Sequence, residues 1–188
     1  IGGDFGSFED LRQLDDRDVN AVIHLGAVTG GCTEHDGIMV NVEGSRCLMR
    51  YLIDQDAKID IFTASHFGML DQVTALLESN PDLISAKDAE GFQALHWCTR
   101  PLGDTDDCLA ITKLLLEKGA DVNLPGGCEW TPLHCVAEWW EFVPQAQLLL
   151  DHGANINPKD NEDNTPLDLA IDRKRKDLII FLCKKGGE

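Results

Sequence analysis

Between residues 130 and 157, the order of apolar and polar positions predicts two helices joined by a turn. Apolar residues follow helical spacing in the first half of this stretch: Leu133, Val136 and Ala137. Thr131-Pro132 precedes them, which is typical of a helix start, because threonine can accept a hydrogen bond from a free backbone N–H and proline has none to leave unpaired. Leu148-Leu149-Leu150 belongs to a second helix that ends before Gly153, since glycine readily adopts a left-handed conformation. The stretch therefore predicts one helix–turn–helix unit.

This unit recurs along the chain. Its helix starts are Ala94-Leu95-His96, Thr131-Pro132-Leu133-His134 and Thr165-Pro166-Leu167-Asp168. Its exit turn occurs as Gly119-Ala120-Asp121-Val122-Asn123 and again, about 34 residues later, as Gly153-Ala154-Asn155-Ile156-Asn157. A period of this size with a Thr-Pro-Leu-His start resembles the ankyrin-repeat family.

The resemblance implies a mostly α-helical fold, an ankyrin-repeat solenoid of about four helix–turn–helix repeats. One repeat cannot bury its apolar face alone, so neighbouring repeats must stack to form a core. The expected ankyrin-repeat domain is 55–188, with repeats at 59–87, 88–121, 122–155 and 156–188. The first repeat is degenerate, and the second carries an insertion between its helices.

Residues 1–54 do not follow the repeat. The apolar, β-branched stretch 18–28 is typical of a short buried strand, and helices are expected at 8–14 and 38–53. This order predicts a small, incomplete α/β segment. We interpret the abrupt change of pattern at 54–58 as a seam between the two parts of the chain.

The N-terminal segment also resembles a known family. Ala21-Val22-Ile23-His24-Leu25-Gly26-Ala27 and Val40-Asn41-Val42-Glu43-Gly44-Ser45-Arg46 are similar to the NAD-dependent epimerase/dehydratase family, the extended short-chain dehydrogenases. The resemblance implies a truncated, Rossmann-like dinucleotide-binding fold at 1–54. It also implies cofactor contacts at five positions: Asp4, Phe5, Leu25, Gly26 and Ala27.

Two parts of that family's machinery are expected to be missing. Its glycine-rich phosphate loop would precede residue 1, so no helix N-terminus is offered to a pyrophosphate. Its catalytic Tyr-x-x-x-Lys has no counterpart, because Tyr51 is followed by Gln55 at the lysine position. The sequence therefore predicts that the chain is not an enzyme and that it holds no cofactor, with weak NAD binding as the alternative.

The charge of the chain narrows the classes of partner. Asp and Glu number 33 against 16 Lys and Arg, which gives a net charge of −17. Nucleic acids and anionic membranes both favour basic surfaces, so neither is expected as a partner. No apolar run is long enough to span a bilayer and no signal peptide opens the chain, so a cytoplasmic, monomeric protein is predicted. The acidic surface favours a protein partner with a basic or mixed surface.

Histidines and cysteines at repeat positions raise the question of a metal site. His96, Cys98, His134 and Cys135 fall on adjacent first helices, where they could assemble as zinc ligands. Their spacing lacks the close pairs typical of zinc sites, and the favoured interpretation is reduced thiols packed as small apolar groups. The ankyrin resemblance implies that both histidines bond neighbouring turns and lock the repeats together. No metal site is predicted.

Large aromatic side chains mark the candidate partner-binding surface. Ankyrin repeats present finger turns and first helices to a concave groove, and tryptophan and arginine are common interface anchors. The candidate contacts are Trp97, Arg100, Trp130, Glu138, Trp139 and Trp140, with the loop 102–107. We expect one of Trp139 and Trp140 to point inward and the other outward. The run Arg173-Lys174-Arg175-Lys176 is either a basic binding patch or, as we favour, the solvated face of a terminal cap.

Two functions remain open. The first is a protein–protein interaction module that uses the concave ankyrin surface and does not catalyse a reaction. The second is a fragment of an NAD-dependent sugar-nucleotide or sugar-acid epimerase or dehydrogenase fused to an ankyrin domain, with residual cofactor binding. The expected lack of a phosphate loop and of Tyr-x-x-x-Lys favours the first.

Overall fold

In the computed structural model of the chain, the described residues are 59–100, 105–139 and 142–187. All regular secondary structure in these ranges is helical, as the repeat pattern predicts. The first helices of the pairs are α3 (Ile61–His66), α5 (Ala94–Cys98), α7 (Pro132–Trp139) and α9 (Pro166–Asp172). The second helices are α4 (Leu70–Ser79), α6 (Thr105–Glu117), α8 (Val143–Asp151) and α10 (Lys176–Lys185). Two 3₁₀ turns, η1 (Pro81–Ser85) and η2 (Gly127–Glu129), lie between pairs.

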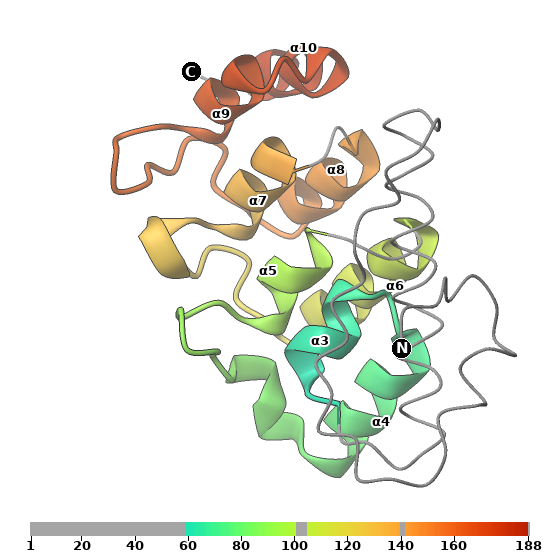
Figure 1. Cartoon of the computed structure of the whole chain (residues 1–188). Helices are drawn as coiled ribbons and strands as arrows, with labels where there is room; N and C mark the ends of the chain where they lie inside the picture. Colours follow the sequence, from blue (N-terminus) through green and yellow to red (C-terminus); the bar gives the residue numbers. More distant parts are fainter. Residues whose placement is uncertain (1–58, 101–104, 140–141, 188) are drawn as a thin grey trace, which may run out of the picture. The chain divides into compact units, whose positions relative to one another are not determined.

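The helices form two layers. The first helices α3, α5, α7 and α9 pack side by side in chain order, and the second helices α4, α6, α8 and α10 do the same. Each first helix also contacts the second helix of its own pair. Figure 1 shows the resulting stack, from the teal α3 to the red α10. Each pair therefore contacts mainly its neighbours along the chain, which is the arrangement of a solenoid.

Leucine and isoleucine at equivalent repeat positions make the core. The large, fully buried side chains include Ile61, Leu95, Ile111, Leu115, Leu133, Leu149, Leu178 and Leu182. Leu95 and Leu133 occupy the same position in successive first helices, and they belong to one continuous apolar cluster. Burying one such side chain stabilises the fold by roughly 2 kcal/mol. The pairs gain this stabilisation only by stacking, because one pair has too little apolar surface of its own to cover its core face.

Glycine follows three of the second helices, as predicted for Gly153. Gly119, Gly153 and Gly186 have φ angles of 92°, 86° and 98°, in the left-handed region that glycine tolerates best. Asparagine side chains connect successive exit turns. The Asn123 Nδ2 donates to the Gly153 carbonyl at 2.9 Å, and the Asn157 Nδ2 donates to the Gly186 carbonyl at 3.2 Å. The exit turns therefore form a hydrogen-bonded ladder between repeats.

Several predictions made for the N-terminal part cannot be compared with the fold. The strand at 18–28, the helices at 8–14 and 38–53, the seam at 54–58 and the cofactor-contact positions all lie outside the described residues. Ile59–Glu188 forms a compact unit of its own.

Candidate partner-binding surface

The buried side chain of His96 caps the start of α5. Its Nδ1 accepts the Gln93 backbone N–H at 3.1 Å, and its Nε2 lies 3.0 Å from the Leu124 carbonyl and 3.1 Å from the Trp130 carbonyl. The ring is fully buried, and this burial lowers its pKa to about 4. His96 is therefore neutral near pH 7, and its Nε2–H is shared between carbonyls of the next repeat.

His134 has the same role one repeat later, and Asp168 takes over part of it in the last pair. The His134 Nδ1 accepts the Thr131 N–H at 3.1 Å, its Nε2 lies 3.2 Å from the Asn164 carbonyl, and burial lowers its pKa. The Asp168 Oδ2 accepts both the N–H and the hydroxyl of Thr165 at 2.8 Å, and these bonds hold the pKa of the carboxyl below its usual value. The predicted structural role of both histidines is confirmed.

The cysteines that the structure describes form no disulfides, and three of them pack as core residues. Cys98, Cys108 and Cys135 are buried, whereas Cys128 and Cys183 are exposed. Burial desolvates two of these thiols, which raises the pKa of Cys98 and raises that of Cys135 to about 12, so both stay protonated. Among the described residues, no group of three or more His, Cys, Asp or Glu side chains could hold a metal ion, so the alternative zinc site gains no support.

The finger turn before α5 holds the Trp97 indole in place. The Asp88 Oδ1 accepts the backbone N–H groups of Glu90 and Phe92 at 2.8 and 2.9 Å, which shapes the turn. The Asp88 Oδ2 accepts the Trp97 indole N–H at 2.8 Å. One carboxylate therefore fixes both the turn and the aromatic side chain, a pairing that the repeat pattern does not predict.

The finger turn before α9 repeats this arrangement with Trp130. The Asp160 Oδ1 accepts the backbone N–H groups of Glu162 and Asn164 at 2.9 and 2.8 Å, and its Oδ2 accepts the Trp130 indole N–H at 3.1 Å. Burial raises the pKa of Asp160, but the hydrogen bonds outweigh it and hold the pKa below its usual value. Trp130 therefore connects two finger turns.

The finger turn between them has glycine where its neighbours have aspartate. A Cβ on Gly126 would lie 2.3 Å from the Phe92 Cδ1, and a Cβ on Gly127 would lie 2.9 Å from the Glu90 carbonyl oxygen. The following Cys128 has a φ of 58°, in the left-handed region. Only glycine leaves room for the Phe92 ring, so this turn is built around an aromatic side chain of the preceding repeat.

Arg100 and Trp139 meet beside Trp97, at the carboxyl ends of α5 and α7. The Arg100 guanidinium carbon lies 4.9 Å from the centre of the Trp97 ring and 4.7 Å from that of Trp139. His66, at the end of α3, packs edge-on against Trp97 with 5.0 Å between ring centres. Trp139 remains 48% exposed, as predicted for one member of the tryptophan pair. These contacts hold a large, exposed aromatic side chain against a cation.

The last repeat holds the end of α7 through two arginines. Arg173 forms an ion pair with Glu138, whose side chain is largely buried. The Arg175 Nη2 donates to the backbone carbonyls of Glu138 and Trp139, at 3.2 Å each. Cations near a helix carboxyl end are favourable, because the free carbonyls there carry partial negative charge. Part of the basic run 173–176 therefore has a structural role beyond that of a solvated cap.

These side chains define what we call the inner-helix end surface, at the ends of α5, α7 and α9. Its members are Trp97, Arg100, Glu138, Trp139, Arg173 and Arg175. Four of them are predicted contacts that the structure brings together. The contact of Glu138 with the arginines of the last repeat depends on how the repeats stack, so the sequence pattern does not predict it.

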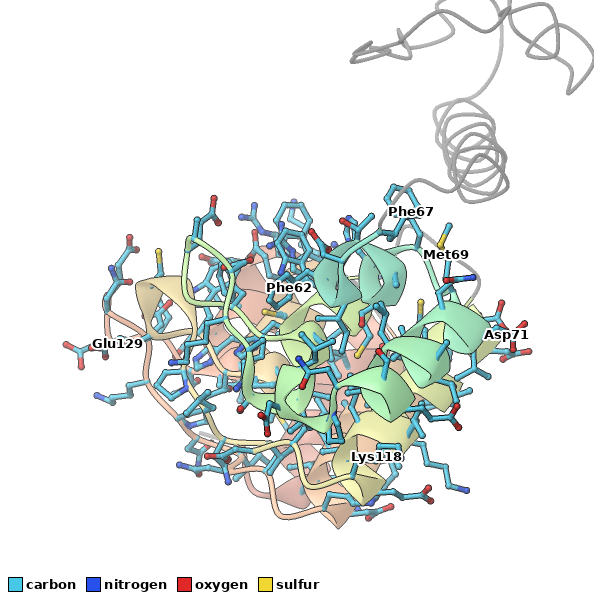
Figure 2. The ribbon with its side chains drawn as sticks, turned by 90° about the horizontal axis from the view of Figure 1, so that it is seen from below. Phe62, Phe67, Met69, Asp71, Lys118 and Glu129 are labelled. Carbon is cyan, nitrogen blue, oxygen red and sulfur yellow. The ribbon has the colours of Figure 1, made fainter. Side chains whose placement is uncertain are left out.

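The remaining predicted contacts lie elsewhere. Trp130 belongs to the finger turns, where its indole N–H is bound to Asp160. Trp140 and residues 101–104 lie outside the described residues, whereas 105–107 form the start of α6. Glu129 lies at the tip of its finger turn and points outward (Figure 2).

A second surface feature lies between the second helices. An open groove of about 380 Å³ separates α6 from α8. It is lined by Asp106, Leu109, Ala110, Lys113, Pro144, Gln147, Leu148 and Asp151. None of the residues of the inner-helix end surface lines this groove, so it serves as a comparison surface for mutagenesis.

Comparison with known families identifies the repeat. The family model for ankyrin repeats (three copies) matches residues 104–188, so this part of the chain consists of ankyrin repeats. The comparison gives no support to the resemblance of residues 1–54 to the epimerase/dehydratase family. No helix in the described ranges has the length and apolar character needed to cross a membrane.

Several curated proteins are similar to the chain. Human palmitoyltransferase ZDHHC13 is 31% identical over 120 residues, which cover 63% of this chain and 18% of that protein. The probable 26S proteasome regulatory subunit p28 of Saccharomyces cerevisiae is 33% identical over 123 residues, covering 62% of this chain and 50% of the subunit. Ankyrin repeat and SOCS box protein 11 of Danio rerio is 41% identical over 73 residues, covering 39% of this chain and 23% of that protein. The chain thus spans half or less of each of these relatives.

Proposed function

We propose that this chain is a protein-interaction module whose partner binds at the inner-helix end surface. The observation that carries the proposal is Trp139, which is 48% exposed although its ring lies 4.7 Å from the Arg100 guanidinium. Tryptophan and arginine are among the side chains most enriched at the energetic centres of protein interfaces. A rigid stack of ankyrin repeats holds both residues in place before a partner arrives, which lowers the entropic cost of binding.

The finger turns carry acidic side chains at the rim of the proposed interface. Glu90, Glu129 and Glu162 are exposed at the tips of three successive fingers. These carboxylates favour basic side chains on the partner, in agreement with the net charge of −17. The partner that fits the whole face therefore has a mixed charge, with cations opposite the finger tips.

The proposal includes the absence of catalysis. His96 and His134, which are the histidines at repeat positions, are buried and bound to backbone groups of neighbouring turns. Such groups are not available to a substrate. Likewise, we propose a cytoplasmic, monomeric protein with no bound cofactor, on the basis of its charge and composition. The epimerase/dehydrogenase alternative depends on residues 1–54 alone.

Site-specific crosslinking tests where the partner binds. A photoreactive amino acid at position 172 of the full chain, which is exposed at the end of α9 beside Arg173 and leaves Trp139 in place, is expected to crosslink one partner in a cell extract. The same group at Lys113, in the groove between α6 and α8, is the matched control and is expected to give none. The captured protein must then bind the purified chain, and Trp139→Ala must weaken that binding by at least about tenfold. Crosslinking from position 113 but not 172 would contradict the proposal.

A further inference from the structure

The inner-helix end surface gathers arginines although the chain as a whole is acidic. The whole chain carries −17, but Arg100, Arg173 and Arg175 all belong to this surface. The described carboxylates beside them include the buried Glu138, the exposed Asp172 next to Arg173, and Asp88, which binds the Trp97 indole N–H. The finger-tip carboxylates belong to the turns, at the other end of the first helices. The net charge of the protein therefore does not describe its proposed binding surface.

Glu138 and Asp172 both act on one arginine, Arg173. Glu138 forms an ion pair with Arg173, and the hydrogen bond to Glu138 raises the pKa of Arg173, with a smaller contribution from the nearby charge of Asp172. Arg175 uses its Nη2 to hold backbone carbonyls. Within the described ranges, neither Arg100 nor Arg175 forms an ion pair with a carboxylate, and Arg100 differs from Arg175 in that its guanidinium lies against aromatic rings.

The contacts of Arg100 that the structure describes are mainly to aromatic rings. Its guanidinium lies over the rings of Trp97 and Trp139, and its buried Nε has no acceptor among the described residues. The donors that a partner can reach are therefore the terminal Nη groups and not the Nε. A guanidinium held by aromatic rings can offer these groups to the two oxygens of a carboxylate.

We infer that the inner-helix end surface binds an acidic segment of the partner, in which an Asp or Glu carboxylate accepts hydrogen bonds from Arg100 and an adjacent apolar side chain lies against Trp139. This inference rests on the proposed function and specifies the chemistry of the bound segment. Charge complementarity supports it, since no carboxylate in the part of the chain that the structure describes pairs with Arg100, although the protein is acidic as a whole. The carboxylate replaces water at the guanidinium edge, while Trp139 supplies the apolar contact.

A peptide array tests this inference with the full 188-residue chain. The array presents peptides of equal length in matched sets, which surround the same aromatic or aliphatic residue with Glu and Asp, with Lys and Arg, or with Ser and Asn. The bound set is expected to be acidic. The tightest acidic peptide is then titrated in solution and followed by tryptophan fluorescence, and its affinity is expected to fall as salt concentration rises.

Substitutions separate binding chemistry from structural damage. Arg100→Gln is expected to weaken the acidic peptide about tenfold, and Arg100→Lys less, because lysine keeps the charge but loses the planar fork. Lys113→Gln, which removes a cation from the groove between α6 and α8, is expected to leave the affinity for the peptide unchanged. Circular dichroism and thermal unfolding of each variant show whether the fold persists.

The outcomes distinguish the inference from the proposed function. Selection of acidic peptides that depend on both Arg100 and Trp139 supports both. Selection of basic peptides that depend on Trp139 overturns the inference and leaves the proposed function standing. Binding that depends on neither Arg100 nor Trp139 overturns the inference, and so does the absence of selection from any set. Failure of the crosslinking experiment at position 172 is the separate result that overturns the proposed function.

Discussion

The two ends of the first helices use polar and aromatic side chains in different ways. At the amino-terminal ends, His96 and His134 are fully buried, and both ring nitrogens of each lie within hydrogen-bonding distance of backbone groups. At the carboxyl ends, Trp139 is exposed and the Arg100 Nε has no acceptor among the described residues. The amino-terminal histidines are therefore bound within the protein, whereas the carboxyl ends present an exposed tryptophan and a guanidinium that pairs with no described carboxylate.

This difference follows the repeat. The amino-terminal histidines occupy the same position in successive units, so the stack itself supplies their partners. Arg100 and Trp139 stand where the repeat departs from its pattern, next to the insertion of the second unit and in the tryptophan pair of the third. Residues that obey the repeat therefore stabilise the stack, whereas residues that depart from it are the candidates for recognition.

The largest loss of stability is expected from His96→Ala. It leaves the Gln93 N–H and the Leu124 carbonyl without their His96 partner in a buried region, removes one of the two donors to the Trp130 carbonyl, and opens a cavity. We expect the free energy of unfolding to fall by about 3 kcal/mol, measured by urea denaturation. His152→Ala, at an exposed position at the end of α8, is the matched control and should change it by less than ~0.5 kcal/mol. Equal losses in the two variants would contradict the structural role.

Low pH is expected to destabilise the fold through the same residue, His96. Burial lowers the pKa of His96 from 6.5 to about 4, so below pH 6.5 the unfolded chain takes up a proton that the folded chain resists. Stability from this group is fully present above the unfolded pKa of 6.5 and is lost progressively as the pH falls to about 4, by up to ~3 kcal/mol. Denaturation at several pH values, compared between the wild type and His96→Gln, isolates this contribution. A His96 ring that titrates near its ordinary pKa by NMR would exclude it.

A smaller loss of stability is expected at the finger turn that has Gly126 in place of aspartate. Gly126→Ala places a Cβ within 2.3 Å of the Phe92 ring, so the ring or the turn must move. We expect a loss of about 1–3 kcal/mol in the free energy of unfolding. In the background of Phe92→Ala, which removes the ring, the same substitution should cost much less. Additive losses in the double variant would show that the two residues do not share this space.

The smallest effect on stability is expected at the inner-helix end surface. Arg100→Ala removes cation–π contacts with Trp97 and Trp139 but leaves the ion pair of Glu138 with Arg173 intact. We expect a loss of about 0.5–1 kcal/mol, read from the midpoint of urea unfolding. Glu138→Ala is the informative contrast on the same surface, because it removes that ion pair from a largely buried position. A loss for Arg100→Ala as large as that for His96→Ala would assign this end of the helices to the core.

Much of the helical stack can be predicted from the spacing of a few residues. Thr165-Pro166 marks the start of α9, and the left-handed glycines mark the ends of α6, α8 and α10. The last helix, α10, runs through Lys184 and Lys185 and ends at the left-handed Gly186. Lysines at the end of a helix complement its dipole, which favours this late end.

The arrangement of the candidate surface is harder to predict from the sequence. Aromatic and charged residues near the ends of first helices can be picked out, but their partners lie far along the chain. Glu138 pairs with Arg173 only because α7 and α9 are neighbours in the stack, and Arg175 reaches the end of α7 for the same reason. The hydrogen bond between Trp97 and Asp88 depends on how the finger turn folds back on α5. Such contacts are tertiary, and no local propensity encodes them.

Trp139→Ala in the full chain gives the most direct test of the central claim. The free energy of unfolding and the affinity for the best peptide of the array are measured on the same preparation. We predict that unfolding stays within ~1 kcal/mol of the wild type, because Trp139 is 48% exposed, while the affinity falls at least about tenfold. An unchanged affinity would contradict the claim that the inner-helix end surface binds an acidic segment against Trp139.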